Sequence, residues 1–279
     1  MKIILAAAAA LACIAGAAHA GLQNDIPSCY AANNMGRSAP APERELFVLI
    51  DQTTLLDDKL RDSVRENVAR FLKPGTAFVV ADFSAFSQGR YMEILTAGTL
   101  EAPIPDKDRD AIGVKVLRSF DACMQGQANY GLRLAAGAVN KALDGASPSL
   151  ARSDVLSSVT ELSARVKRSS ARDRVVFLVS DMLENSSVGS FYAAKNVRTI
   201  DPAKELKAAE AARMIGDFGG ARVFVLGAGI VPEERGRPQG VYRDPKAVGA
   251  LKEFWRQFFA RSGADLVEFG TPALMAPVR

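Results

Sequence analysis

Two apolar stretches that each end in an aspartate decide the fold of this chain. Residues 46–51 read Leu-Phe-Val-Leu-Ile-Asp, and residues 175–181 read Val-Val-Phe-Leu-Val-Ser-Asp. Neither stretch alternates apolar with polar residues, and continuous apolar runs of this length are typical of strands that are covered on both faces. Strands of this kind belong to parallel sheets with helices above and below. The two stretches therefore predict an α/β fold.

The surrounding sequence alternates between helical and extended patterns. Apolar residues at helical spacing predict a helix over residues 56–72, which Pro74-Gly75 terminates. The other predicted strands cover residues 77–83, 91–95, 223–226 and 264–269, and the other predicted helices cover residues 107–143 (broken near Gly126), 153–166, 202–215 and 245–260. This alternation predicts a doubly wound, Rossmann-like, mainly parallel sheet with strand order 3-2-1-4-5-6 and helices on both faces.

The first 20 residues have the pattern of a secretory signal peptide. Met1-Lys2 precedes a long apolar run, and Ala18-His19-Ala20 is a typical cleavage pattern. His19 is the only histidine of the chain, so cleavage after Ala20 leaves a mature protein without histidine. This excludes the Ser-His-Asp and Cys-His arrangements and zinc sites that need imidazole. We expect a periplasmic or secreted protein.

Composition and charge narrow the possible partners. Lys and Arg number 35 against 31 Asp and Glu, a formal net charge of +4, which is too balanced to indicate nucleic acid or an anionic membrane as the main partner. After the leader, no stretch approaches the 18 apolar residues of a membrane-spanning helix, so we expect no integral membrane segment. The expected organisation is a lead-in over residues 21–43, an α/β domain over residues 44–270 and a tail over residues 271–279.

The cysteines agree with export. Cys13 lies in the leader, which leaves Cys29 and Cys123 as an even pair. In an oxidising compartment we expect a disulfide that ties the N-terminal segment to the domain. A redox or metal-binding thiol pair is the alternative, although the spacing is not C-x-x-C. Cleavage at Cys13, as in a lipoprotein, is a further alternative, although residues 10–12 lack the aliphatic residue usual three positions before such a cysteine.

A candidate site follows from the strand order. Strands one and four are neighbours at the point where the order reverses, so Asp51 and Asp181 would point into one crevice. Thr53 and Ser153, the latter at the start of a helix, would add hydroxyl groups. Carboxylates with short hydroxyls form a hard oxygen site suited to Mg²⁺, Mn²⁺ or Ca²⁺. The alternative is structural, with these residues capping helices or returning the chain to water.

These residues resemble the von Willebrand factor A domain family over roughly residues 44–270. The family carries an adhesion site written D-x-S-x-S, then a threonine, then an aspartate. Asp51 matches the first aspartate, Thr53 the first serine, Ser153 the threonine and Asp181 the last aspartate. Two departures are Leu55 in place of the second serine and Met182 in place of the usual glycine.

The resemblance implies a protein-binding domain of an envelope assembly rather than an enzyme. A partner carboxylate would complete the coordination of Mg²⁺ or Mn²⁺ held by Asp51, Thr53, Ser153 and Asp181. Because Leu55 removes one hydroxyl ligand, a metal-free variant of this surface is the alternative.

An alternative hypothesis, that the chain is an enzyme, also starts from Asp51. Residues 49–57 superficially resemble the D-x-D-G-T-L motif of haloacid-dehalogenase-type phosphatases, in which the first aspartate attacks phosphorus in a Mg²⁺-dependent reaction. Asp51 would be that nucleophile. However, Thr53 replaces the second aspartate and Thr54 stands at the glycine position. Gly227-Ala228-Gly229 follows another predicted strand, but Val231-Pro232 excludes the dinucleotide-binding fingerprint there.

Overall fold

The computed structural model describes residues 24–87, 90–147, 153–193, 196–231 and 244–279. The predicted signal peptide, with Cys13 and His19, lies outside the described residues and stays a prediction. Among the helices within these ranges, none is both long enough and apolar enough to cross a membrane.

A six-stranded sheet forms the centre of the molecule, in the order β3-β2-β1-β4-β7-β8. Its strands are β1 (Arg44–Asp51), β2 (Thr76–Ser87), β3 (Arg90–Leu100), β4 (Asp173–Val179), β7 (Ala221–Leu226) and β8 (Ala264–Phe269). Numbered along the chain as the strands of this sheet, this order is 3-2-1-4-5-6. All neighbouring strands run parallel except β2 and β3, which are antiparallel. The predicted fold class and strand order are therefore confirmed.

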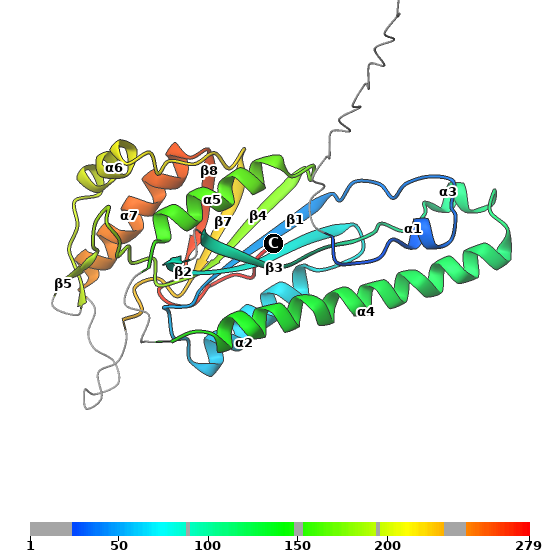
Figure 1. The fold of residues 1–279 in the computed structure, drawn as a ribbon, viewed down its shortest axis with the longest axis horizontal. Helices are drawn as coiled ribbons and strands as arrows, with labels where there is room; N and C mark the ends of the chain where they lie inside the picture. Colours follow the sequence, from blue (N-terminus) through cyan, green and yellow to red (C-terminus); the bar gives the residue numbers. More distant parts are fainter. Residues whose placement is uncertain (1–23, 88–89, 148–152, 194–195, 232–243) are drawn as a thin grey trace, which may run out of the picture.

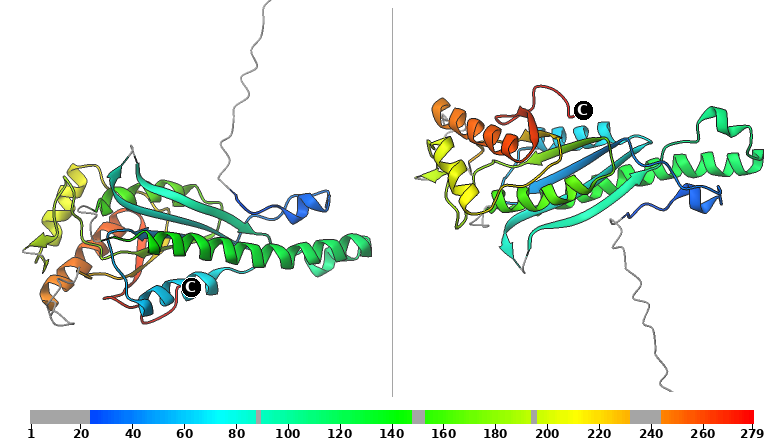
Figure 2. Two further views of the ribbon diagram at one scale, coloured as in Figure 1. Left: turned by 60° about the horizontal axis from the view of Figure 1, so that its bottom comes forward. Right: turned by 90° about the horizontal axis from the view of Figure 1, so that it is seen from above.

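Helices cover both faces of the sheet (Figures 1 and 2). On one face lie α2 (Asp58–Phe71) and α4 (Val114–Asp144), and on the other lie α5 (Val155–Arg168) and α7 (Pro245–Arg261), with α6 (Pro202–Ala211) packed on α7. The remaining short elements are α1 (Cys29–Ala32), α3 (Asp106–Arg109), and a two-stranded ribbon of β5 (Tyr192–Ala193) and β6 (Asn196–Val197).

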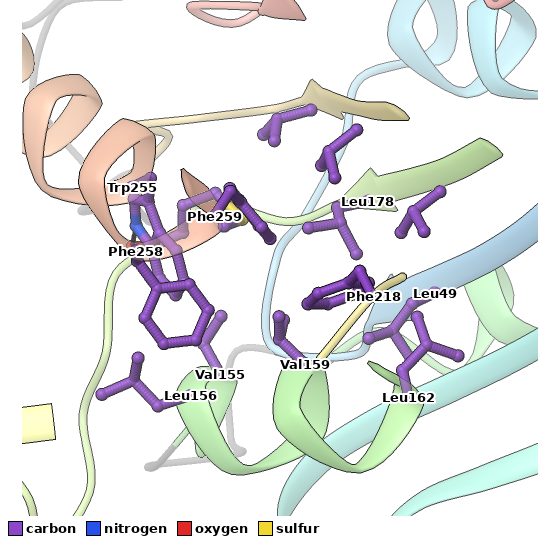
Figure 3. Packing of buried hydrophobic residues seen from close by; sticks show 14 of the residues in the cluster. Leu49, Val155, Leu156, Val159, Leu162, Leu178, Phe218, Trp255, Phe258 and Phe259 are labelled. Atoms are coloured by element: carbon purple, nitrogen blue, oxygen red, sulfur yellow. Dashed lines mark hydrogen bonds between the residues drawn. The ribbon is translucent and has the colours of Figure 1, made fainter. Parts of the chain in front are cut away.

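The continuous apolar strands fill two cores at once, because successive side chains of a strand point to opposite faces. In β1, Leu46, Val48 and Ile50 belong to the core under α2 and α4. Phe47 and Leu49 belong to the core under α5 and α7. Figure 3 shows this second core, where Leu49 lies beside Leu162 of α5 and near Phe218.

The predicted break near Gly126 is wrong. The helical region divides between Arg109 and Val114, and α4 then runs without interruption through Gly126 to Asp144. Gly126 is exposed, and a Cβ there would meet nothing within 4 Å. A glycine in a helix costs about 1 kcal/mol relative to alanine, and the packing of α4 against α2 and β3 is enough to offset that cost.

The first half of α4 extends beyond the sheet together with α1 and α3 (Figures 1 and 2). We call this region, residues 27–40 and 102–125, the arm. It has a small core of its own, in which Cys29, Tyr30, Ile104 and Phe120 are buried. The structure contains the expected disulfide between Cys29 and Cys123, with a Cα–Cα distance of 5.7 Å. The lead-in is thereby fixed to α4.

Candidate functional site

The candidate site lies where β1 and β4 end side by side at the middle of the sheet. The two strands pair in register from Arg44 with Asp173 to Ile50 with Val179, so their next residues leave the sheet at the same edge. Asp51 is 1% exposed and Asp181 is 2% exposed. Both predicted carboxylates are therefore present at the switch point, and both are buried.

The Asp51 carboxylate accepts four hydrogen bonds. Its Oδ1 accepts from the backbone N–H of Thr53 at 2.8 Å and from the Thr53 hydroxyl at 2.6 Å. Its Oδ2 accepts from the Ser180 hydroxyl at 2.8 Å and from the Ser153 hydroxyl at 3.2 Å. The structure thus brings Thr53 and Ser153 to Asp51, and adds Ser180.

The Asp181 carboxylate is bound by a different set of donors. The Tyr192 hydroxyl donates to its Oδ2 at 2.6 Å, and the backbone N–H of Leu183 donates to its Oδ1 at 2.9 Å. The backbone N–H of Asp181 itself donates to the Thr54 hydroxyl at 3.0 Å. Thr54 therefore joins the loop after β1 to the end of β4, and is not among the groups that bind the Asp51 carboxylate.

Burial dominates the electrostatics of this pair. It raises the pKa of Asp51, against the opposing effect of the hydrogen bonds from Thr53, Ser180 and Ser153. Burial, and next the nearby charge of Asp51, raises the pKa of Asp181 to about 8. Burial also raises the pKa of Tyr192 far above its ordinary value, so its hydroxyl keeps its proton. Burial and the proximity of the two carboxyl groups therefore both disfavour a state in which Asp51 and Asp181 are ionised together.

Glu184 fixes the third loop of the site. Its side chain is fully buried, and Oε2 accepts a hydrogen bond from the backbone N–H of Leu156 at 2.8 Å, in the first turn of α5. Burial raises the pKa of Glu184 to about 7. In the same loop, the backbone N–H of Asn185 donates to the carbonyl oxygen of Ser153 at 3.0 Å. These bonds hold the start of α5, and with it the Ser153 hydroxyl, next to β4.

The two departures from the adhesion motif have clear structural consequences. Met182, where the family usually has glycine, adopts a φ of +59°, a left-handed conformation that glycine favours. Its side chain is fully buried in the core, and its carbonyl oxygen accepts a hydrogen bond from Trp255 Nε1 at 2.9 Å. Leu55 is 44% exposed, so an apolar side chain lies at the rim where the motif has a hydroxyl.

The residues present do not fit a divalent cation well. Among the side chains that the structure describes, no three His, Cys, Asp or Glu residues are grouped so as to hold a metal ion. Both oxygens of Asp51 and both of Asp181 already accept hydrogen bonds from protein groups. Leu55 supplies no oxygen. The Mg²⁺ or Mn²⁺ that the resemblance implies stays a prediction.

Four residues of the site, Thr54, Ser180, Glu184 and Tyr192, were missed as site residues in the sequence. Ser180 directly precedes Asp181, and its place at the strand end was the available signal. Thr54 lies between two residues of the motif, but only the turn geometry shows that it points toward β4. Tyr192 is 11 residues beyond Asp181 in a polar loop, and no sequence pattern indicates it.

The glycines after β7 also belong to this edge of the sheet. The backbone N–H of Gly229 donates to the carbonyl oxygen of Asp181 at 2.8 Å. Gly227 has a φ of +102°, and a Cβ there would lie 3.1 Å from the carbonyl oxygen of Ser180. These glycines permit close backbone approach to the end of β4.

The overall architecture is a doubly wound, mainly parallel α/β fold. No protein-family model matches the chain, and no curated protein matches it. Solved structures similar to it include an aerotolerance-related membrane protein from Bacteroides fragilis NCTC 9343 (10% identity, 81% of this chain and 92% of that chain, TM-score 0.36). Another is the conserved hypothetical protein BatB from Bacteroides thetaiotaomicron (13% identity, covering 81% of this chain and 90% of that chain, TM-score 0.38). A third is the ArnB paralog VWA2 from Sulfolobus acidocaldarius (11% identity, covering 68% of this chain and 36% of that chain, TM-score 0.31).

Proposed function

We propose that this chain is an exported protein-binding domain of a periplasmic or envelope assembly. The single observation that carries the proposal is the convergence of three loops, residues 51–57, 153–156 and 180–186, at the switch point of the sheet. Hydrogen bonds of the Asp51, Thr54 and Glu184 side chains hold these loops together. A set of loops fixed on a rigid sheet is the usual basis of a binding surface.

The burial of Asp51 favours binding over phosphate-ester hydrolysis. A nucleophilic carboxylate must reach the phosphorus atom of its substrate, whereas Asp51 is 1% exposed and both its oxygens accept two hydrogen bonds. The same bonds suit a framework residue that fixes the loops around it. The proposed role of Asp51 is therefore to shape the surface.

The partner would contact the rim of the site, where side chains are accessible. Leu55 projects from the loop after β1 with 44% of its surface exposed. Asp57, two residues further along the same loop, and Ser187, on the segment after β4, are also exposed. An apolar side chain surrounded by polar groups is a common centre for a small protein interface. We propose that Leu55 is the apolar contact of this surface.

A capture experiment tests this assignment. The mature protein, immobilised, is used to recover partners from an envelope extract, and Leu55→Asp is compared with Val267→Asp. Val267 is 46% exposed on β8, so the control places the same charge at an equally accessible apolar residue away from the site. We expect Leu55→Asp to lose the partner at least tenfold and Val267→Asp to retain it. Equal retention by both variants would contradict the assignment.

Export is tested separately by the N-terminus of the processed protein. Mass spectrometry of the chain recovered from a periplasmic fraction should find Gly21 as the first residue. A full-length chain that keeps Met1 and stays in the cytoplasmic fraction would overturn this part of the proposal.

A further inference from the structure

Tyr192 closes the site from outside the sheet. Its hydroxyl donates to Asp181 Oδ2 at 2.6 Å, at the short end of the O–H···O range. In an adhesion site of the resembled family, this aspartate belongs to a cation-binding group. In this chain the Tyr192 hydroxyl donates a hydrogen bond to Asp181 instead.

The segment that carries Tyr192 is anchored on both sides. Phe191 is 2% exposed and packs edge-on against Phe254 of α7, with ring centroids 5.1 Å apart. Its backbone N–H donates to the carbonyl oxygen of Glu184 at 2.8 Å. Directly after β6, Arg198 pairs with Glu205 of α6 at 2.7 Å. The Tyr192 hydroxyl is therefore held at Asp181 by the core of the protein.

Leu55, on the loop after β1, also makes the site less suited to a cation. It stands where the adhesion motif has a second hydroxyl, and its apolar side chain offers no oxygen to a hard cation. We propose that the Tyr192 hydroxyl substitutes for a cation at this site, and that Leu55 removes a ligand that a cation would need. The site is then complete without metal.

This inference deepens the proposed function, because a partner would then bind in the absence of any cation. Its own basis, however, is the geometry of Asp181, Tyr192 and Leu55, and no partner is needed to test it. Failure of the capture experiment and failure of this inference are therefore distinguishable.

The test measures Mn²⁺ binding to the mature, disulfide-bonded protein by electron paramagnetic resonance, with thermal unfolding in EDTA and in 1 mM MnCl₂. The variants are Tyr192→Phe and the double variant Tyr192→Phe/Leu55→Ser. Tyr130→Phe, on an exposed tyrosine of α4, is the matched control for loss of a phenol hydroxyl.

We expect the wild type to bind no Mn²⁺ at 1 mM and to melt at the same temperature in EDTA and in MnCl₂. Tyr192→Phe should melt about 2–6 °C lower because a buried hydrogen bond is lost, whereas Tyr130→Phe should melt within 1 °C of wild type, about the scatter expected of a surface substitution. The double variant should bind Mn²⁺ and be stabilised by it.

Three results would overturn the inference. The first is Mn²⁺ binding by the wild type that Asp181→Asn abolishes. The second is a double variant that folds and binds no Mn²⁺, because Tyr192 and Leu55 would then not be what excludes the cation. The third is a Tyr192→Phe variant as stable as the wild type. If the substituted proteins fail to fold, the wild-type titration alone still decides the first result.

Discussion

Removing the disulfide of the arm should cost this protein a large part of its stability. The perturbation is Cys29→Ala/Cys123→Ala. The two cysteines are 94 residues apart, and the loop they close contains β1, α2, β2 and β3. Closing a loop of this length removes enough entropy from the unfolded chain to stabilise the native state by about 4.7 kcal/mol in the chain-entropy model.

Native contacts keep the arm in place without the bond. Tyr30 and Phe120 pack edge-on with centroids 5.0 Å apart, and Glu101 accepts hydrogen bonds from the Ser28 hydroxyl and the Cys29 backbone N–H. We therefore expect the double variant to fold to the same structure. The loss should fall mainly on the free energy of unfolding, by about 3–5 kcal/mol.

Equilibrium urea denaturation measures this loss. The oxidised wild type is compared with the double variant and with the wild type kept in reductant, which should behave as the variant does. Adding reductant to the variant is the control and should change nothing. A loss below about 1 kcal/mol, or a reduced wild type as stable as the oxidised one, would refute the chain-entropy reasoning.

Three further substitutions test the polar groups and the backbone near the site. Burial, and next the charge of Glu93, raises the pKa of Asp82 to about 6. The free energy of unfolding should therefore fall as the pH rises from 4 to 6 and Asp82 ionises. In urea denaturation, Asp82→Asn should show a smaller fall over this pH range than the wild type, by up to about 3 kcal/mol. Met182→Gly relieves about 1 kcal/mol of left-handed backbone strain but loses a fully buried side chain, so calorimetry should show a net loss of about 2–4 kcal/mol, and a gain would contradict this. Glu184→Ala removes the acceptor at Leu156 N–H and should raise amide exchange in the first turn of α5 at least tenfold, while that of β8 stays unchanged.

The strand order and the two aspartates could be predicted because their signals are local. A run such as residues 46–50 is typical of a strand covered on both faces, and alternation with helices then leaves few ways to order the sheet. The lengths of β2 and β3 were underestimated. In β2 the polar residues after Phe83 end the apolar pattern while the strand continues to Ser87, and in β3 small and polar residues follow Leu95 while the strand continues to Leu100. Backbone pairing continued the strands where side-chain hydrophobicity did not indicate them.

The helix break and the closure of the site depend on contacts that no local pattern contains. Gly126 would interrupt an isolated helix, but α4 is stabilised by packing along its second half. Tyr192 reaches Asp181 only because Phe191 is buried against α7 and the ribbon turns back on itself. Both features follow from tertiary packing, which a single sequence does not reveal.

The site is best understood as a polar core that replaces, at the end of the sheet, the apolar cores along its length. Asp51 joins β1 to β4 and to the start of α5 through hydroxyl groups, Thr54 joins the loop after β1 to Asp181, and Tyr192 joins Asp181 to the ribbon. The bonds from Ser153 to Asp51 and from Asp181 to Thr54 connect segments that are far apart in the sequence. Because a buried carboxylate without its donors is costly, loss of one member should loosen all three loops together. The affinity of a partner that contacts Leu55 at the rim should therefore fall when residues of the buried network are substituted, although the partner does not contact those residues.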